Sequence, residues 1–227
     1  MHACRRLRGM RLAVFDMAGT VINEGGLVYK TLYETLLSFG LNVTPHNIEQ
    51  WHGANKYEVL DHFLKLESNS TEFLERQHIL RQKFDDNLKQ QYFSKKSVKL
   101  IDPSVPELFD KIRYNGTKIA LNTGYSKEIQ SAIINNLHLN NIIDDKIASN
   151  QVRRGRPYPD MINKLMIRHD IYDPKRVIKI GDTQNDIYEG KHAGCAKLIG
   201  VLTGAGTRDS LNKAGATEIL NSIIDLK

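Results

Sequence analysis

Asp16 is the first residue of this chain that is placed to do chemistry. It follows an unbroken apolar run, residues 12–15, and two residues separate it from Gly19-Thr20. A short apolar run of this kind predicts a buried strand of a parallel sheet. An Asp at the carboxyl end of such a strand would lie in the crevice where open α/β sheets bind ligands. Gly19 lets the backbone approach a bound anion, and the following amides can cradle a phosphate.

Three later segments repeat this arrangement of a strand or turn followed by polar groups. In chain order they supply a hydroxyl, a cation and a pair of carboxylates, which suit a phosphoryl group and a metal ion. The segments are strand 118–122 before Thr123-Gly124, the basic turn Arg154-Gly155-Arg156-Pro157, and strand 177–180 before Gly181-Asp182, with Asp186 four residues after Asp182.

The second half of the chain contains the elements that must position these groups. Helix and strand patterns alternate from residue 101 to 227, which predicts a parallel sheet covered by helices. A length of 227 residues fits one α/β domain with a modest insertion, or two small domains. We expect helices at 103–115, 126–137, 158–168 and 184–193, strands at 117–122, 146–149, 176–181, 196–201 and 217–220, and helix starts at Asp102-Pro103 and Asp173-Pro174.

Residues 21–100 show no strand pattern and have helical spacing instead. Apolar residues recur every three or four positions, which predicts the core of a small helical domain. Gly25-Gly26 and Ser94-Lys95-Lys96-Ser97 are its expected flexible connections. The residues that recur are Tyr57, Leu60, Phe63-Leu64, Leu80, Phe84, Leu88 and Tyr92.

The net charge of +6 raises the question of a nucleic-acid partner. The basic residues are dispersed except at Arg5-Arg6 and Arg153-Arg154-Gly155-Arg156, and no nucleic-acid-binding motif is recognisable. Because the second cluster falls in the expected phosphate site, the charge favours a cationic pocket for an anionic substrate.

No stretch approaches the ~20 apolar residues that span a bilayer, so we expect no membrane partner. Residues 1–11 lack the apolar centre of a secretory signal, and we expect 1–9 to be a loose extension. The two cysteines, Cys4 and Cys195, lie far apart, which favours a reducing, cytoplasmic setting. Cys195 is expected to serve packing.

With its motifs in this order, the chain resembles the haloacid dehalogenase (HAD) superfamily over residues 10–225. The resemblance implies a Rossmann-like parallel sheet flanked by helices, with a small α-helical C1 cap that closes over the crevice and excludes water. The implied core is residues 1–20 and 101–227, and the implied cap is residues 21–100. The implied activity is hydrolysis, with Asp16 attacking phosphorus to form an aspartyl-phosphate.

The resemblance also implies Mg²⁺ as cofactor, because a cation has to neutralise the repulsion between a phosphoryl dianion and the carboxylate. Its implied metal site is made of Asp16, the Ala18 backbone carbonyl and Asp182, with Asp186 holding a metal-bound water. The implied ligands of the small anionic phosphonate or phosphate substrate are Gly19, Thr20, Thr123, Gly124, Arg156 and His52.

Two departures from the commoner HAD pattern resemble one branch, the phosphonoacetaldehyde hydrolases (phosphonatases). Ala18 stands where most HAD phosphatases have an Asp that protonates the leaving oxygen. Arg156 replaces the usual Lys, and its planar fork suits bidentate phosphate binding. The matching motifs are Asp16-Met17-Ala18-Gly19-Thr20, Gly155-Arg156-Pro157 and the tail Gly200-Val201-Leu202-Thr203-Gly204-Ala205.

A phosphonatase needs an amine that turns the substrate aldehyde into an imine, so that the carbon leaves as an enamine. Lys56, in Gly53-Ala54-Asn55-Lys56, occupies the corresponding place and is the candidate, with His52 just before this turn. Lys56 would need a lowered pKa to attack an aldehyde at neutral pH. Cleavage of a phosphonoacetaldehyde-type C–P bond is the leading expectation.

Two alternatives remain open at this stage. One is a phosphomonoesterase or phosphotransferase on a small metabolite, with Lys56 only a substrate clamp. The other is a phosphate-binding protein that has lost turnover, which the loss of the acid at Ala18 supports and the retained carboxylates oppose. The sequence leaves the oligomeric state open, with a homodimer as one expectation.

Overall fold

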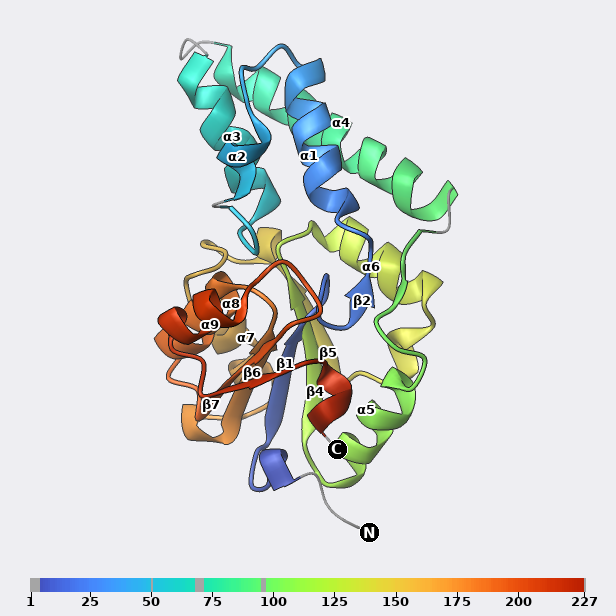
Figure 1. The fold of residues 1–227 in the computed structure, drawn as a ribbon, viewed down its shortest axis with the longest axis vertical. Helices are drawn as coiled ribbons and strands as arrows, with labels where there is room; N and C mark the ends of the chain where they lie inside the picture. The colour runs from blue at the N-terminus through green and yellow to red at the C-terminus, as the bar shows by residue number, and fades with distance from the viewer. Residues whose placement is uncertain (1–4, 50, 68–71, 95–96, 227) are drawn as a thin grey trace.

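The computed structural model describes residues 5–49, 51–67, 72–94 and 97–226. A six-stranded, all-parallel sheet lies at its centre (Figure 1). Each strand predicted from the sequence is present, displaced by no more than one residue at either end. The strands, in spatial order, are β5 (Asp145–Ala148), β4 (Lys118–Thr123), β1 (Leu12–Asp16), β6 (Val177–Gly181), β7 (Lys197–Val201) and β8 (Glu218–Leu220).

Helices cover both faces of the sheet, because side chains alternate along each buried strand. Ala13 and Phe15 of β1 face one apolar cluster, and Leu12 and Val14 face the other. The first cluster packs under α5 (Val105–Tyr114) and α6 (Lys127–Asn136), the second under α7 (Asp160–Arg168), α8 (Gln184–His192) and α9 (Arg208–Ala214). The predicted α/β fold with a helix-flanked parallel sheet is confirmed.

The two expected helix starts have different outcomes. Asp102 accepts hydrogen bonds from the backbone and hydroxyl of Ser104 at 2.8 and 2.7 Å, directly before α5. Asp173 caps only a single 3₁₀ turn, η5 (Pro174–Arg176). The turn ends after three residues because β6 begins at the next residue.

Four further helices lie together beyond the carboxyl ends of the strands (Figure 1). The residues at helical spacing, from Leu60 to Tyr92, are largely buried between them, as the spacing predicts. Their apolar cluster is continuous with the one under α5 and α6, so these helices pack onto the sheet domain. The helices are α1 (Leu27–Ser38), α2 (Pro45–Glu49), α3 (Lys56–Glu67) and α4 (Phe73–Lys89), which continues as a π-helical turn, η2 (Gln90–Ser94).

The expectation of no strand in residues 21–100 is wrong at its two ends. The chain segments that join the sheet to the four helices pair as short antiparallel strands, β2 (Ile22–Asn23) and β3 (Lys99–Leu100). Two residues are too few to show alternation, so the sequence carries no signal for them. The expected connection Gly25-Gly26 has left-handed backbone at both residues. Lys95 and Lys96 lie outside the described residues.

The expected loose extension is also wrong where it is described. Residues Arg5–Leu7 form a 3₁₀ turn (η1) and Leu7 is buried. Arg6 pairs with Glu218 at 2.6 Å and donates to the carbonyl of Asp225 at 2.8 Å, which ties this segment to the end of the chain. Residues 1–4, including Cys4, lie outside the described part, and Cys195 is buried as expected. None of the described helices is long and apolar enough to cross a membrane.

Candidate active site

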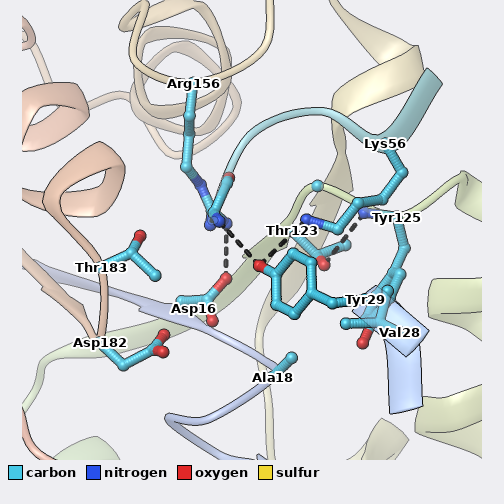
Figure 2. Close-up of a pocket in the computed structure, with 12 residues that line it drawn as sticks. Asp16, Ala18, Val28, Tyr29, Lys56, Thr123, Tyr125, Arg156, Asp182 and Thr183 are labelled. Atoms are coloured by element: carbon cyan, nitrogen blue, oxygen red, sulfur yellow. Dashed lines mark hydrogen bonds and ion pairs between the residues drawn. The ribbon is translucent and has the colours of Figure 1, made fainter. Parts of the chain in front are cut away.

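The candidate active site is a small cavity at the carboxyl ends of β4, β1 and β6. The chain passes from β1 to β4 on one side and reaches β6 on the other, which opens a crevice next to β1. The first turn of α1 and the turn before α3 close this crevice from above. Its lining residues are Asp16, Ala18, Val28, Tyr29, Gly53, Lys56, Thr123, Gly124, Tyr125, Arg156, Asp182 and Thr183 (Figure 2).

Arg156 binds the expected nucleophile directly. Its Nη2 lies 2.7 Å from Asp16 Oδ1, and its Nη1 lies 3.0 Å from Asp186 Oδ1. Burial raises the pKa of the Asp16 carboxyl, and the guanidinium opposes that rise. Arg156 itself is buried, which acts to lower its pKa, but Asp186, Asp16 and Glu189 raise it. The guanidinium is therefore a fixed cation at the place where an anionic group would meet Asp16.

A second buried cation, Lys179, supports this arrangement from β6. Its ammonium has three acceptors: Asn122 Oδ1 at 2.6 Å, Asp186 Oδ1 at 2.9 Å and Glu189 Oε2 at 3.2 Å. Asn122 in turn donates to both Glu189 oxygens and accepts from Arg156. Because each charged group here has an opposite charge within reach, the cluster can stay ionised although it is fully buried.

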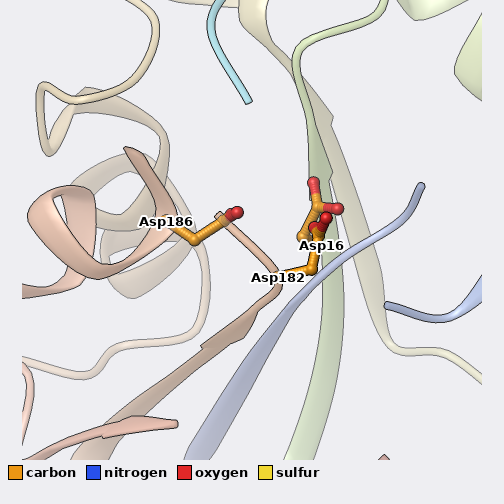
Figure 3. A group of neighbouring side chains, drawn as sticks. All are labelled: Asp16, Asp182 and Asp186. Atoms are coloured by element: carbon orange, nitrogen blue, oxygen red, sulfur yellow. The ribbon is translucent and has the colours of Figure 1, made fainter. Parts of the chain in front are cut away.

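Three carboxylates meet beside this cluster and suit a metal ion. Oxygens of Asp16, Asp182 and Asp186 all lie within 4.8 Å of one another, and all three residues are buried (Figure 3). Among the described residues Asp182 is the one of the three without an ion pair. Burial, then the charges of Asp16 and Asp186, raise its pKa well above the ordinary value. A hard divalent cation would relieve this repulsion, so the residues present fit the Mg²⁺ that the fold family implies.

Asp186 differs from Asp182 in facing two cations. Oδ1 faces Arg156 and Lys179, and Oδ2 accepts from the Thr183 hydroxyl at 2.6 Å and the Thr183 amide at 3.2 Å. Burial alone would raise the pKa of Asp186, but the two cations lower it. Asp186 is therefore placed to orient its neighbours rather than to hold an ion by itself.

Loss of Asp182 should consequently weaken Mg²⁺ binding far more than loss of Asp186. Replacing a residue that only supports the ligands typically costs about 10–100-fold in affinity, and a direct ligand costs more. Calorimetric titration of Mg²⁺ into Asp182→Ala and Asp186→Ala proteins would measure the difference, with Asp186→Asn as the variant that keeps the side-chain volume. Equal losses would assign Asp186 to the ion directly.

Glycines let the loops approach Asp182 closely. Gly19 has a φ of +78°, and a Cβ there would lie 2.7 Å from Asp182 Oδ2. A Cβ on Gly204 would lie 1.9 Å from the same oxygen. The Ala205 amide donates to Asp182 Oδ2 at 2.8 Å, and the Thr203 hydroxyl donates to the Gly19 carbonyl at 2.6 Å. The tail motif noted in the sequence thus forms the wall behind Asp182.

Lys56 reaches the cavity from the first residue of α3. It is buried, and its Nζ donates to the Ala54 carbonyl at 2.9 Å and to the Tyr29 hydroxyl at 3.3 Å. Burial, and secondly the positive charge of Arg156, lower the pKa of Lys56 to about 8. Close packing fixes this turn, because a Cβ on Gly53 would meet Thr183 Oγ1 and one on Gly124 would meet the Ala54 carbonyl.

The other predicted site residues take different places. Thr123 and Gly124 line the cavity. Thr20 is buried and donates to Asp182 Oδ1 at 3.3 Å, so it supports a carboxylate. Gly19 and His52 line a wider, neighbouring opening of about 460 Å³. The His52 ring packs against the Tyr29 ring at a tilt, with 4.1 Å between centroids, and burial, then Lys56, lower the pKa of His52.

Several residues of the site escaped the sequence reasoning. The sequence does contain a signal for Lys179. A lysine inside the otherwise apolar strand 177–180 is expected to be buried and therefore paired with an opposite charge. Glu189 lies one turn after Asp186 on α8, which is the spacing of a shared face. Tyr29 and Tyr125 carry no such signal, because aromatic residues near a loop mostly pack.

Comparisons with known proteins identify the family of this chain. The model of the haloacid dehalogenase-like hydrolase family matches residues 13–201. The phosphonoacetaldehyde hydrolase of Latilactobacillus sakei subsp. sakei (strain 23K) is 27% identical over 193 residues, which cover 82% of this chain and 73% of that protein.

Solved structures show the same fold. A phosphonoacetaldehyde hydrolase-like protein from Oleispira antarctica has a TM-score of 0.76 at 23% identity, covering 96% of this chain and 90% of that one. A predicted phosphoglycolate phosphatase from Haemophilus somnus 129PT has a TM-score of 0.73 at 19% identity, covering 96% of each chain. With a family model spanning most of the chain, the protein belongs to the haloacid dehalogenase-like hydrolases.

Proposed function

We propose that this hydrolase cleaves the C–P bond of phosphonoacetaldehyde or a close aldehyde phosphonate, with Asp16 as nucleophile and Lys56 as the imine-forming amine. The observation that carries the proposal is the position of Lys56. Its buried Nζ opens into the same cavity as Asp16, Arg156 and Thr123. The place of an acid for an ester leaving group is occupied by Ala18, which also lines the cavity.

The proposed reaction begins at Lys56. Its amine condenses with the aldehyde and releases water, which leaves an iminium that can accept the electrons of the C–P bond. A carboxylate oxygen of Asp16 then attacks phosphorus, the C–P bond breaks, and the electron pair moves into an enamine on Lys56. Protonation of the enamine carbon and addition of one water release the aldehyde product. A second water hydrolyses the aspartyl-phosphate and restores Asp16.

The phosphoryl group would sit between Asp16 and the cations. Arg156 supplies a fork for two phosphoryl oxygens, and the Thr123 hydroxyl and the amides around Gly124 surround the same space. Mg²⁺, held by Asp16, Asp182 and the Ala18 carbonyl, would neutralise the dianion and so reduce its repulsion of Asp16. Asp186 would keep Arg156 and Thr183 in place.

The four helices α1 to α4 would act as a cap. The cavity measures about 20 Å³, roughly the room for one water molecule. An organophosphorus substrate is larger, so the turn that bears Gly53 and Lys56 would have to withdraw for entry. Rotation about the connections at Gly25-Gly26 would allow this, since both glycines have open space around their Cα atoms.

Substrate tests combined with covalent trapping decide the proposal. Phosphonoacetaldehyde should be turned over with Mg²⁺ and not with EDTA, while phosphate monoesters should react much more slowly. Borohydride added during turnover should reduce the imine to a stable adduct, and peptide mass mapping should place it on Lys56. An unlabelled Lys56 together with faster turnover of esters would move the function to ester hydrolysis.

The trapping rate should depend on pH through the lowered pKa of Lys56. A lysine attacks carbonyl groups in its neutral form, which exists above its pKa. With a pKa of about 8, roughly a tenth of Lys56 is neutral at pH 7. The initial rate of adduct formation should therefore rise about tenfold from pH 6 to 7 and level off above about pH 9. A rate that keeps rising past pH 10 would indicate an ordinary lysine.

A further inference from the structure

Tyr29 is a polar group of the cavity that none of the sequence motifs accounts for. Its hydroxyl oxygen accepts hydrogen bonds from the Gly53 amide at 2.8 Å and from Lys56 Nζ at 3.3 Å. A phenol oxygen has two lone pairs and one hydrogen, so both acceptor sites are used. The hydrogen must point elsewhere, and it makes no hydrogen bond to another described residue. Figure 2 shows this hydroxyl beside Lys56 and facing the Asp16 side of the cavity.

The position of Tyr29 is fixed by its surroundings. The Glu24 carboxylate accepts from the amides of Gly26 and Val28 at 3.1 and 2.8 Å and so holds the first turn of α1. The Tyr92 hydroxyl donates to the same carboxylate at 3.0 Å. The His52 ring packs against the Tyr29 ring at a tilt. The hydroxyl is therefore held at Lys56 rather than rotating freely.

We infer that Tyr29 relays protons from Lys56 to the carbonyl oxygen of the substrate while the imine forms. This inference rests on the proposed function. The step balances as neutral lysine amine plus aldehyde giving imine plus water. The C–N bond forms, the C–O bond breaks, and both nitrogen protons end in the water molecule, after which a proton from solvent converts the imine to the iminium. In each of the two proton transfers, the Tyr29 oxygen accepts a proton from Nζ while the Tyr29 hydroxyl donates its own hydrogen to the oxygen of the substrate carbonyl. Tyr29 is therefore neutral after each transfer.

Among the described residues, the other hydrogen-bond partner of Nζ and the second tyrosine of the cavity cannot do both halves of this transfer. The second partner of Lys56 is the Ala54 carbonyl, which accepts a hydrogen bond and has no proton to give. The Tyr125 hydroxyl is paired with the Tyr92 hydroxyl at 2.8 Å. Burial raises the pKa of Tyr29, so the phenol keeps its proton at neutral pH and remains a donor. Tyr29 is thus the group in contact with the reacting nitrogen that can accept and donate together.

The substitution Tyr29→Phe removes the hydroxyl and keeps the ring that packs against His52. With phosphonoacetaldehyde and borohydride quenching at successive times, the rate of adduct formation on Lys56 should fall at least about a hundredfold, as for loss of a general acid–base group. Tyr33→Phe is the matched control, since Tyr33 lies one turn along α1 and does not line the cavity. It should trap at the unsubstituted rate.

Tyr29 could relay protons, or it could only hold Lys56 in position. A reaction that needs a positioned amine but no proton relay distinguishes these two roles. Acetylation by acetic anhydride needs no proton delivered to a departing hydroxyl, so Tyr29→Phe should leave the Lys56 acetylation rate within about twofold. If acetylation and trapping fall together, or if trapping is unchanged, the relay is overturned while the proposed function stands. If Lys56 is not trapped even in the unsubstituted enzyme, the proposed function fails and the relay fails with it.

Discussion

Asp16→Asn should abolish turnover while the protein stays folded. The amide is a poor nucleophile and cannot form the aspartyl-phosphate, so kcat should fall on the order of 10⁴-fold or more. The substitution removes the ion pair with Arg156, yet it also removes a buried charge close to Asp182 and Asp186. Because these effects oppose each other, Tm should shift by no more than about 3 °C.

Steady-state assays and thermal melts would test this expectation. Asp110→Asn is a suitable control, because Asp110 is exposed on α5 and away from the site. The mass of the peptide that bears the substituted residue should be checked for deamidation back to Asp. A variant that stays fully amidated and still keeps more than a few per cent of the activity would contradict the aspartyl-phosphate mechanism.

Lys56→Arg should be nearly as damaging under the proposed function. Arginine keeps the positive charge beside the phosphoryl site, but a guanidinium does not form imines. Turnover of an aldehyde phosphonate should fall on the order of 10⁴-fold, and borohydride should no longer label residue 56. Binding of inorganic phosphate, measured by calorimetry, should change far less because the charge is retained.

The exposed Lys65 on the same helix provides the control for Lys56. Lys65→Arg should leave turnover and labelling unchanged, since its side chain lies outside the cavity. The opposite pattern is also informative. A Lys56→Arg enzyme that hydrolyses its best substrate at full rate would show that residue 56 is only a cationic clamp, and ester hydrolysis would become the favoured reaction.

The positions of the core strands along the chain and the identity of the groups at their ends follow from the sequence. Residues 12–15 are a continuous apolar run, and residues 118–122 and 177–180 are mostly apolar; such segments become buried strands of a parallel sheet. Asp16, Thr123 and Asp182 lie at or just after the ends of these segments, and a parallel sheet delivers all such ends to one edge. The spacing of Leu80, Phe84 and Leu88 likewise predicted helix α4, because a repeat near 3.6 residues leaves one face to bury.

What surrounds those strand ends was decided by the tertiary structure. Lys179, Glu189 and Asn122 form one charge cluster because β4, β6 and α8 meet there, which no local pattern encodes. Thr20 turned toward Asp182, although its position next to Gly19 favoured a bound anion. The pairing of β2 with β3 depends on two segments that are more than 70 residues apart in the chain.

Lys56 and Tyr29 show most directly which properties of the site the sequence predicts and which depend on the tertiary structure. The sequence identified Lys56 as a candidate from a turn and a resemblance, without its surroundings. Its lowered pKa arises from burial and from Arg156, a hundred residues further along the chain. The contact with Tyr29 arises because α1 and the turn before α3 close the same crevice. Residue types and strand ends are local properties, whereas burial and proximity belong to the packed structure.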